Sequence, residues 1–151
     1  MQLIKEVQEY RIGIVKSAFN HFITDRLLTG CLNQLQAHGV RLENIATFEV
    51  PGAIELPLVA KTLGVTRRYD AIIMLGCVIR GDTSHYDYVC QQVSYGCQNI
   101  ALDLGLPIIF GVLTTDNEEQ ALARVGGQHG HKGADAADTA LAMIAIMKKI
   151  Q

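Results

Sequence analysis

Residues 71–89 read AIIMLGCVIRGDTSHYDYV, an apolar run that passes directly into a polar cluster. The apolar run shows no alternation between apolar and polar residues, and this pattern is typical of a β-strand covered on both faces. Strands of this kind belong to parallel sheets that carry helices on each side. The stretch therefore predicts a buried parallel strand, with a glycine, an acid, two hydroxyls and a histidine where that strand ends.

The same arrangement of apolar runs and amphipathic stretches recurs along the chain. Strands are expected at residues 11–16, 44–50, 69–78 and 107–113, and helices at 23–38, 53–63, 89–104, 117–124 and 134–150. Pro57 is compatible with its helix only near the first turn. The segment GGQHGHKG at 126–133 is expected to be a glycine-rich loop.

Repeated strand–helix units predict a parallel sheet with right-handed crossovers and helices on both faces. We therefore expect an α/β fold in which residues 1–151 form a single domain. Its three α/β/α layers would enclose a flavodoxin-like parallel sheet of four strands.

Composition and charge exclude several classes of protein. The chain has 151 residues, of which 49% are hydrophobic and 19% charged, as in globular proteins. A formal net charge of −2 provides no general attraction for nucleic acid or an anionic membrane. No apolar run approaches the roughly 20 residues of a membrane span. The N-terminal stretch MQLIKEVQEY carries charges where a secretory signal would be apolar.

The cysteines indicate a reducing compartment. The four cysteines show no CxxC spacing, and three of them lie in apolar stretches. Buried reduced thiols are the expected state, which suits a cytoplasmic protein. The pair His129 and His131 stands in a glycine-rich loop without a third ligand, so no metal site is predicted.

Topology gives the polar residues a common location. In a parallel sheet the ligand binds beyond the carboxyl ends of the strands. Four loops are expected at that edge: SAFNHF at 17–22, PGAIE at 51–55, the polar stretch 79–89, and TTDN at 114–117. The sequence therefore predicts that their side chains converge, although they are far apart along the chain.

The polar stretch contains features of a helix start and of an anion site. Ser84 and Asp87 match the S-x-x-D capping box. A glycine-containing loop before a helix also presents free N–H groups to a phosphate, although both the P-loop and the GxGxxG fingerprint are missing. Asp82 would repel a phosphate unless its side chain turns away. His85 falls in the first turn, where an imidazole could transfer a proton.

Four residues in other segments are further candidates. Phe19 could pack in the core or offer an aromatic face to a planar ligand. Glu55 lies in an apolar segment and should therefore have a partner. Arg124 and Lys132 flank the glycine-rich loop, where they could be ordinary surface cations or a phosphate clamp.

Five motifs occur together in this chain: FN-x-F-I-T at 19–24, PGA-x-E-x-P at 51–57, LG-x-VIRG-x-T-x-HYDYV at 75–89, FG-x-LTT at 110–115, and G-x-KG at 130–133. In this order and spacing they resemble the lumazine synthase family, and the resemblance covers almost the whole chain. It implies condensation of 5-amino-6-(D-ribitylamino)uracil with 3,4-dihydroxy-2-butanone 4-phosphate to 6,7-dimethyl-8-ribityllumazine in riboflavin biosynthesis. Phosphate and water are released, and no cofactor takes part.

The resemblance also implies three groups of site residues. The catalytic group is His85, which would transfer protons. The group that would bind the ribitylaminouracil comprises Phe19, Asn20, Ala53, Ile54, Glu55, Cys77, Val78, Ile79, Phe110 and Lys132. The group that would bind phosphate comprises Asp82, Thr83 and Arg124. Phe110 would reach the pocket from a neighbouring subunit.

The family resemblance further implies a homopentamer with its sites between adjacent subunits. The short connection at 126–133 favours a 60-subunit icosahedral shell over smaller assemblies, and association with riboflavin synthase is a further implied partnership. Nucleic acid and membrane are not expected partners.

Three alternatives remain open from the residues. A riboflavin synthase of the archaeal type would dismutate lumazine on a similar fold. A non-catalytic flavin- or lumazine-binding protein would need stacking, but it would not need both His85 and Arg124. A flavodoxin-like electron carrier would need a hydroxyl-rich loop after the first strand, which SAFNHF does not resemble.

Overall fold

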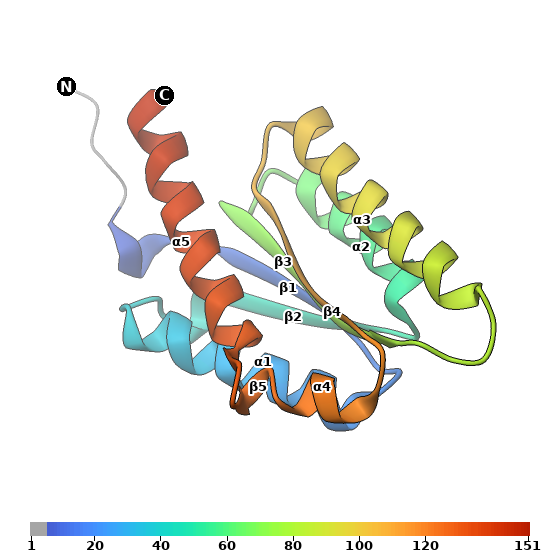
Figure 1. Cartoon of the computed structure of the whole chain (residues 1–151). Coiled ribbons are helices and arrows are strands. Elements are labelled where there is room, and N and C mark those ends of the chain that lie inside the picture. Colours follow the sequence, from blue (N-terminus) through green and yellow to red (C-terminus); the bar gives the residue numbers. More distant parts are fainter. Residues whose placement is uncertain (1–5) are drawn as a thin grey trace.

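The computed structural model describes residues 6–151 and shows a sheet between two layers of helices (Figure 1). The first five residues, part of the stretch in which no secretory signal is expected, lie outside the described residues. The sheet contains β1 (Ile12–Ser17), β2 (Ile45–Val50), β3 (Ala71–Ile79) and β4 (Ile108–Thr115). Its strands are all parallel, in the order β2-β1-β3-β4. The predicted four-stranded α/β/α fold is confirmed.

The helices divide between the two faces of the sheet. One layer contains α1 (His21–Ala37) and α5 (Lys132–Ile150), and the other contains α2 (Leu56–Val65) and α3 (His85–Leu104). The short elements are η1 (Val7–Glu9), η2 (Leu42–Asn44), η3 (Ala53–Glu55), α4 (Glu118–Leu122), β5 (Val125–Gly127) and β6 (Gly130–His131). Within residues 6–151, none of the helices is both long and apolar enough to cross a lipid bilayer.

Strand β3, which contains the apolar run at 71–79, lies at the centre of the hydrophobic core. Residues 71–78 of β3 are all buried, as the absence of alternation predicts. Ile73 and Leu75 face the α1/α5 layer, whereas Ile72 and Met74 face the α2/α3 layer. Burying each such side chain contributes about 1.5–3 kcal/mol. The apolar run therefore stabilises both halves of the core.

Most predicted boundaries agree with the structure to within a few residues, and Pro57 stands at the start of α2 as expected. The prediction for 126–133 was wrong, because this segment contains the antiparallel β5–β6 hairpin and the start of α5. Gly126 and Gly130 adopt φ of 102° and 78°, which permits the tight reversal. The His131 Nδ1 atom then accepts hydrogen bonds from the N–H groups of Gly133 and Ala134, so α5 begins two residues earlier than predicted.

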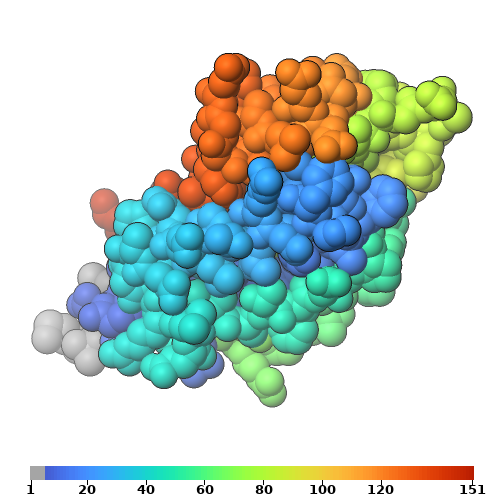
Figure 2. All heavy atoms as spheres, turned by 90° about the horizontal axis from the view of Figure 1, so that it is seen from below, coloured from blue at the N-terminus to red at the C-terminus, as the bar shows by residue number. Residues whose placement is uncertain are grey.

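The β5–β6 hairpin packs beside α1. Gly30 of α1 lies so close to the His131 ring that a Cβ atom there would overlap it. Viewed from below, the orange atoms of the α4–β5 region lie directly beside the blue atoms at the start of α1 (Figure 2). Arg124 lies between α4 and β5, in the segment that leads into this hairpin.

Buried thiols predict a loss of stability in alkali. Burial raises the pKa of Cys31 and Cys77 to about 12, and that of Cys97 to about 11. The same thiols ionise at about pH 8.5 in the unfolded chain. Above that pH the unfolded state binds fewer protons than the folded state, so the free energy of unfolding falls by up to about 1.4 kcal/mol per pH unit for each thiol.

We expect the urea midpoint to stay level near neutral pH and to fall steeply from about pH 9 to 11. Urea titrations across that range measure the slope. A double variant, Cys31→Ala and Cys97→Ala, is the control and should show a clearly shallower fall. A wild-type midpoint that stays level up to about pH 10.5 would contradict the prediction.

Candidate active site

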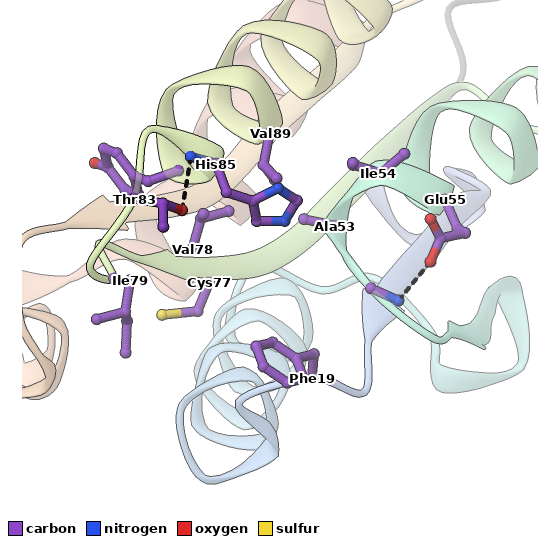
Figure 3. Close-up of a pocket in the computed structure, with 13 residues that line it drawn as sticks. Phe19, Ala53, Ile54, Glu55, Cys77, Val78, Ile79, Thr83, His85 and Val89 are labelled. Atoms are coloured by element: carbon purple, nitrogen blue, oxygen red, sulfur yellow. Dashed lines mark hydrogen bonds between the residues drawn. The ribbon is translucent and has the colours of Figure 1, made fainter.

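A pocket of about 290 Å³ opens at the carboxyl ends of β1 and β3 (Figure 3). Its lining comes from the loop after β1, the segment after β2, the end of β3 and the start of α3. The lining residues are Phe19, Gly52, Ala53, Ile54, Glu55, Cys77, Val78, Ile79, Gly81, Thr83, His85, Tyr86 and Val89. Three of the four predicted loops therefore meet here. In the described chain the loop after β4 contributes no residue to this lining.

His85 is the titratable ring at the middle of the pocket. It is the first residue of α3, and its imidazole projects between Val78 and Ala53 (Figure 3). The His85 N–H group lies 3.3 Å from the Thr83 hydroxyl oxygen, which accepts from it. This position gives the imidazole access both to solvent and to a bound molecule, as a proton-transfer group requires.

The predicted capping box at this helix start was wrong. Within the described chain, the Ser84 side chain makes no capping hydrogen bond. The hydroxyl of the neighbouring Thr83 instead accepts a hydrogen bond from the backbone N–H group of His85. The Asp87 carboxylate lies 3.6 Å from the guanidinium of Arg80, the residue directly after β3, so the acid that the capping box requires pairs with this cation.

The loop after β1 supplies an exposed aromatic ring. Phe19 is 70% exposed, although it is a large apolar side chain, and it faces the pocket opposite His85 (Figure 3). That exposure favours an aromatic surface for a ligand over core packing. Asn20 lies outside the pocket lining of the described residues. Its side-chain amide donates a 2.9 Å hydrogen bond to the Cys77 carbonyl, which ties the Phe19 loop to β3.

Glu55 has the partner that its apolar surroundings predict. Its Oε1 atom accepts a 3.0 Å hydrogen bond from the N–H group of Gly52 (Figure 3). This contact closes the turn that begins η3 and holds Ala53 and Ile54 at the pocket wall. The carboxylate therefore orients the loop and also remains exposed to a ligand.

Cys77, Val78 and Ile79 form the end of β3 along the pocket. Burial raises the pKa of the Cys77 thiol to about 12, so this group is neutral near pH 7. A neutral buried thiol is a poor nucleophile. The end of β3 is therefore an apolar wall, and its backbone provides the polar groups.

Three of the residues predicted for the ligand site lie outside the pocket around His85. Phe110, Arg124 and Lys132 line a second pocket, of about 590 Å³, along β4 at the open edge of the sheet. Among residues 6–151, none lines both pockets. The Arg124 Nη1 atom donates to the Gln120 carbonyl at 2.8 Å, and the Lys132 N–H group donates to the Arg124 carbonyl at the same distance. The backbones of Arg124 and Lys132 are thus joined beside β4.

The residues of the loop at 81–83, where a phosphate site is expected, do not all line the first pocket. Gly81 and Thr83 line the first pocket, while Asp82 between them is exposed and, in the described chain, lies outside that lining. Sequence reasoning did not select Gly52, Tyr86 and Val89 as site residues. Val89 could have been found, because it lies one helical turn after His85 and so shares its face of α3.

Comparison with known proteins gives a consistent result. A family model described as 6,7-dimethyl-8-ribityllumazine synthase matches residues 9–148. Curated proteins of that name from two strains of Coxiella burnetii, CbuG_Q212 and RSA 493 / Nine Mile phase I, are similar to this chain. Each is 54% identical to it over 142 residues, which cover 94% of this chain and 94% of the relative.

Proposed function

Because this chain belongs to the 6,7-dimethyl-8-ribityllumazine synthase family, we propose that the pocket around His85 binds the ribitylaminouracil and carries the proton transfers of its condensation. The chain is a transferase of riboflavin biosynthesis that forms 6,7-dimethyl-8-ribityllumazine. The observation that supports the site most strongly is the His85 imidazole, which projects into a pocket with an exposed aromatic ring opposite.

The reaction joins an amine to a ketone. The amine of 5-amino-6-(D-ribitylamino)uracil attacks the ketone of 3,4-dihydroxy-2-butanone 4-phosphate, and loss of water gives an imine. Phosphate then leaves, and ring closure with further loss of water completes the lumazine. Each step needs reactants held in register and a group that moves protons.

The pocket contains groups suited to both needs. The Phe19 ring offers a surface on which a pyrimidine can stack. The segment Ala53–Glu55 would contact the ribityl chain, with the Glu55 carboxylate accepting from its hydroxyls. Cys77, Val78 and Ile79 would meet the uracil through backbone groups. His85, at the centre, would take the proton from the attacking amine and return it to the departing oxygen.

The start of α3 would hold the phosphate. The first N–H groups of a helix lack intrahelical partners and attract anions. Residues 81–83 lead directly into that helix. Asp82 would contribute its N–H group, and Thr83 its N–H group and hydroxyl. An anion site of this kind stabilises the phosphate as it leaves.

We propose that Phe110, Arg124 and Lys132 act on the pocket of an adjacent subunit. All three line the open edge at β4, away from the His85 pocket. Phe110 is 41% exposed there, as is typical of an apolar side chain that a partner covers. The outer face of α3 also exposes Tyr88, Tyr95 and Leu102 at seven-residue spacing, a stripe suited to packing against another copy.

These features support a homopentamer whose sites lie between subunits. The short β5–β6 hairpin favours further assembly into a 60-subunit shell, which could associate with riboflavin synthase. We also propose that residues 1–151 form one domain and that the protein acts in the cytoplasm. Sedimentation tests the shell: a species of pentamer or decamer size would contradict it.

A product assay tests the activity itself. Purified protein mixed with the two substrates should develop the fluorescence of the lumazine. The archaeal-type riboflavin synthase alternative predicts riboflavin formed from added lumazine, and a storage protein would form neither product. Absence of lumazine from a folded sample would contradict the proposed function.

Mixed assemblies test whether the site is shared. Chains with His85→Ala and chains with Arg124→Met each keep one intact half of the site. A complete site forms wherever the pocket of an Arg124→Met chain meets the edge of a His85→Ala chain. Equal amounts, unfolded and refolded together and assayed with the butanone phosphate well below its wild-type KM, should regain about one quarter of wild-type activity through random assembly.

Each variant refolded alone is the control for this mixture. If the mixture is no more active than the mean of the two variants, His85 and Arg124 serve the same subunit, and the proposed intersubunit site is wrong.

A further inference from the structure

We propose that Arg80 is a positioning residue for the condensation: it holds the first turn of α3, and with it His85 and the loop at 81–83, against the end of β4. This inference rests on the roles proposed above for His85 and for residues 81–83. Arg80 directly follows β3 and immediately precedes that loop.

One set of contacts joins Arg80 to the end of β4. Its backbone N–H group donates to the Thr115 carbonyl at 2.9 Å. Its Nε atom donates to the Asp116 carboxylate, also at 2.9 Å. Both the backbone and the side chain of Arg80 are thereby fixed to the neighbouring strand.

A second set of contacts reaches the helix that carries His85. The Arg80 guanidinium carbon lies 4.3 Å from the centre of the Tyr86 ring, within the range of a cation–π contact. The Arg80 Nη1 atom lies 3.6 Å from the Asp87 carboxylate. Tyr86 and Asp87 are the two residues that follow His85, so the guanidinium bridges the end of β4 and the turn from which His85 projects.

Tyr86 extends this connection into the site. It lines the His85 pocket, and its phenol group interacts with Thr114, which lines the second pocket. Burial raises the pKa of Tyr86, while the hydrogen bond with Thr114 and the Arg80 charge act in the opposite direction. A neutral Tyr86 ring held by Arg80 and Thr114 therefore stands between the two groups of site residues.

The positive charge of Arg80 is paired with two carboxylates of this chain. Asp116 and Asp87 both face its guanidinium, and in the described chain Arg80 lies outside the lining of the His85 pocket. A cation in this position acts on the geometry of the loop and not directly on the phosphate. The loop needs such support, because few hydrogen bonds hold residues 81–83: the Thr83 hydroxyl meets the His85 N–H group, and Arg80 anchors the loop upstream.

The exposure of the paired side chains distinguishes a positioning role for Arg80 from a role in global stability. The Arg80, Asp87 and Asp116 side chains are about half exposed, and ion pairs of this kind contribute little to global stability. The contacts should therefore matter for the position of His85 and the loop far more than for the free energy of unfolding.

Arg80→Met tests the inference, with steady-state kinetics for each substrate. We expect kcat to fall about tenfold, because small displacements of reacting groups slow a positioned reaction strongly. The KM for the butanone phosphate should rise several-fold, whereas the KM for the uracil should stay within about twofold, because Phe19 and Ala53–Glu55 do not depend on Arg80. The thermal midpoint should hardly change.

Three further variants make the test specific. Arg80→Lys keeps a charge near Asp116 and should restore part of the activity. Asp116→Asn should reproduce the split between the two KM values, and its effect should not add to that of Arg80→Met. Arg41→Met is the matched control, since Arg41 forms an exposed ion pair with Glu43 beside η2 and should leave all constants unchanged.

Wild-type kinetics for Arg80→Met would overturn the inference. So would a lower kcat with both KM values unchanged and a lowered thermal midpoint, because that pattern describes a purely structural residue. If Arg80→Met does not fold, Asp116→Asn decides by the same criteria. A wild-type chain that forms no lumazine would instead overturn the proposed function, so the two failures are distinguishable.

Discussion

Replacing His85 with alanine is expected to lower kcat by about a hundredfold and to leave both KM values within about twofold. The reason is that the imidazole, the proposed proton carrier, projects into the pocket, while the aromatic and apolar walls proposed to bind the uracil remain. Turnover should fall without vanishing, because orientation by Phe19 and the Ala53–Glu55 segment persists in the variant. Lumazine fluorescence at saturating concentrations of both substrates measures the change.

His21→Ala is the matched control for this prediction. His21 is the first residue of α1, as His85 is the first residue of α3, and it lies outside the pocket lining of the described residues. Its removal should leave kcat unchanged. Wild-type turnover in the His85 variant would eliminate His85 as the proton carrier, and an equal loss in both variants would point to a general effect on folding.

Replacing Arg124 with methionine is expected to raise the KM for the butanone phosphate by about thirtyfold. This factor is equivalent to about 2 kcal/mol, the usual contribution of a hydrogen bond to a charged group. The Gln120 carbonyl holds the guanidinium beside β4, where we propose that it pairs with a phosphate in the adjacent subunit's site. Inhibition by inorganic phosphate should weaken by a similar factor. The KM for the uracil should change little, because that substrate meets other residues.

Two substitutions control for charge and for the loss of an arginine in general. Arg124→Lys keeps the charge but loses the planar fork, so its KM should fall between those of the wild type and Arg124→Met. Arg26→Met removes an exposed arginine of α1 and should have no effect. An unchanged phosphate inhibition constant in Arg124→Met would remove Arg124 from the phosphate site.

Several parts of the structure could be predicted because their signals are local. The unalternating run at 71–78 identified the central strand, since a strand covered on both faces has no polar side. The β5–β6 hairpin could not be predicted, because strands of two or three residues are too short to show periodicity. The capping box failed because Asp87 meets Arg80, a contact that exists only once β3 and α3 lie side by side.

In the candidate site, too, some features could be predicted from the sequence and others could not. The alternation of strands and helices placed the loops after β1, β2 and β3 at one edge, and the structure brings them together around His85. The partner of Glu55 was also foreseeable, because an acid in an apolar segment requires one and the Gly52 N–H group is three residues away. The exposure of Phe19 was not, since an aromatic residue in such a loop fits the core equally well.

The sequence alone thus determined the α/β/α fold, the ligand edge and the types of residue gathered there, because strand periodicity and parallel topology depend only on the order of residues along the chain. Only the tertiary structure placed Phe110, Arg124 and Lys132 along β4 and away from the His85 pocket. It alone also set Arg80 between Asp116 and Tyr86. These placements follow from which strand forms the edge of the sheet and from how the helices pack on it, and both depend on contacts between residues distant in the sequence.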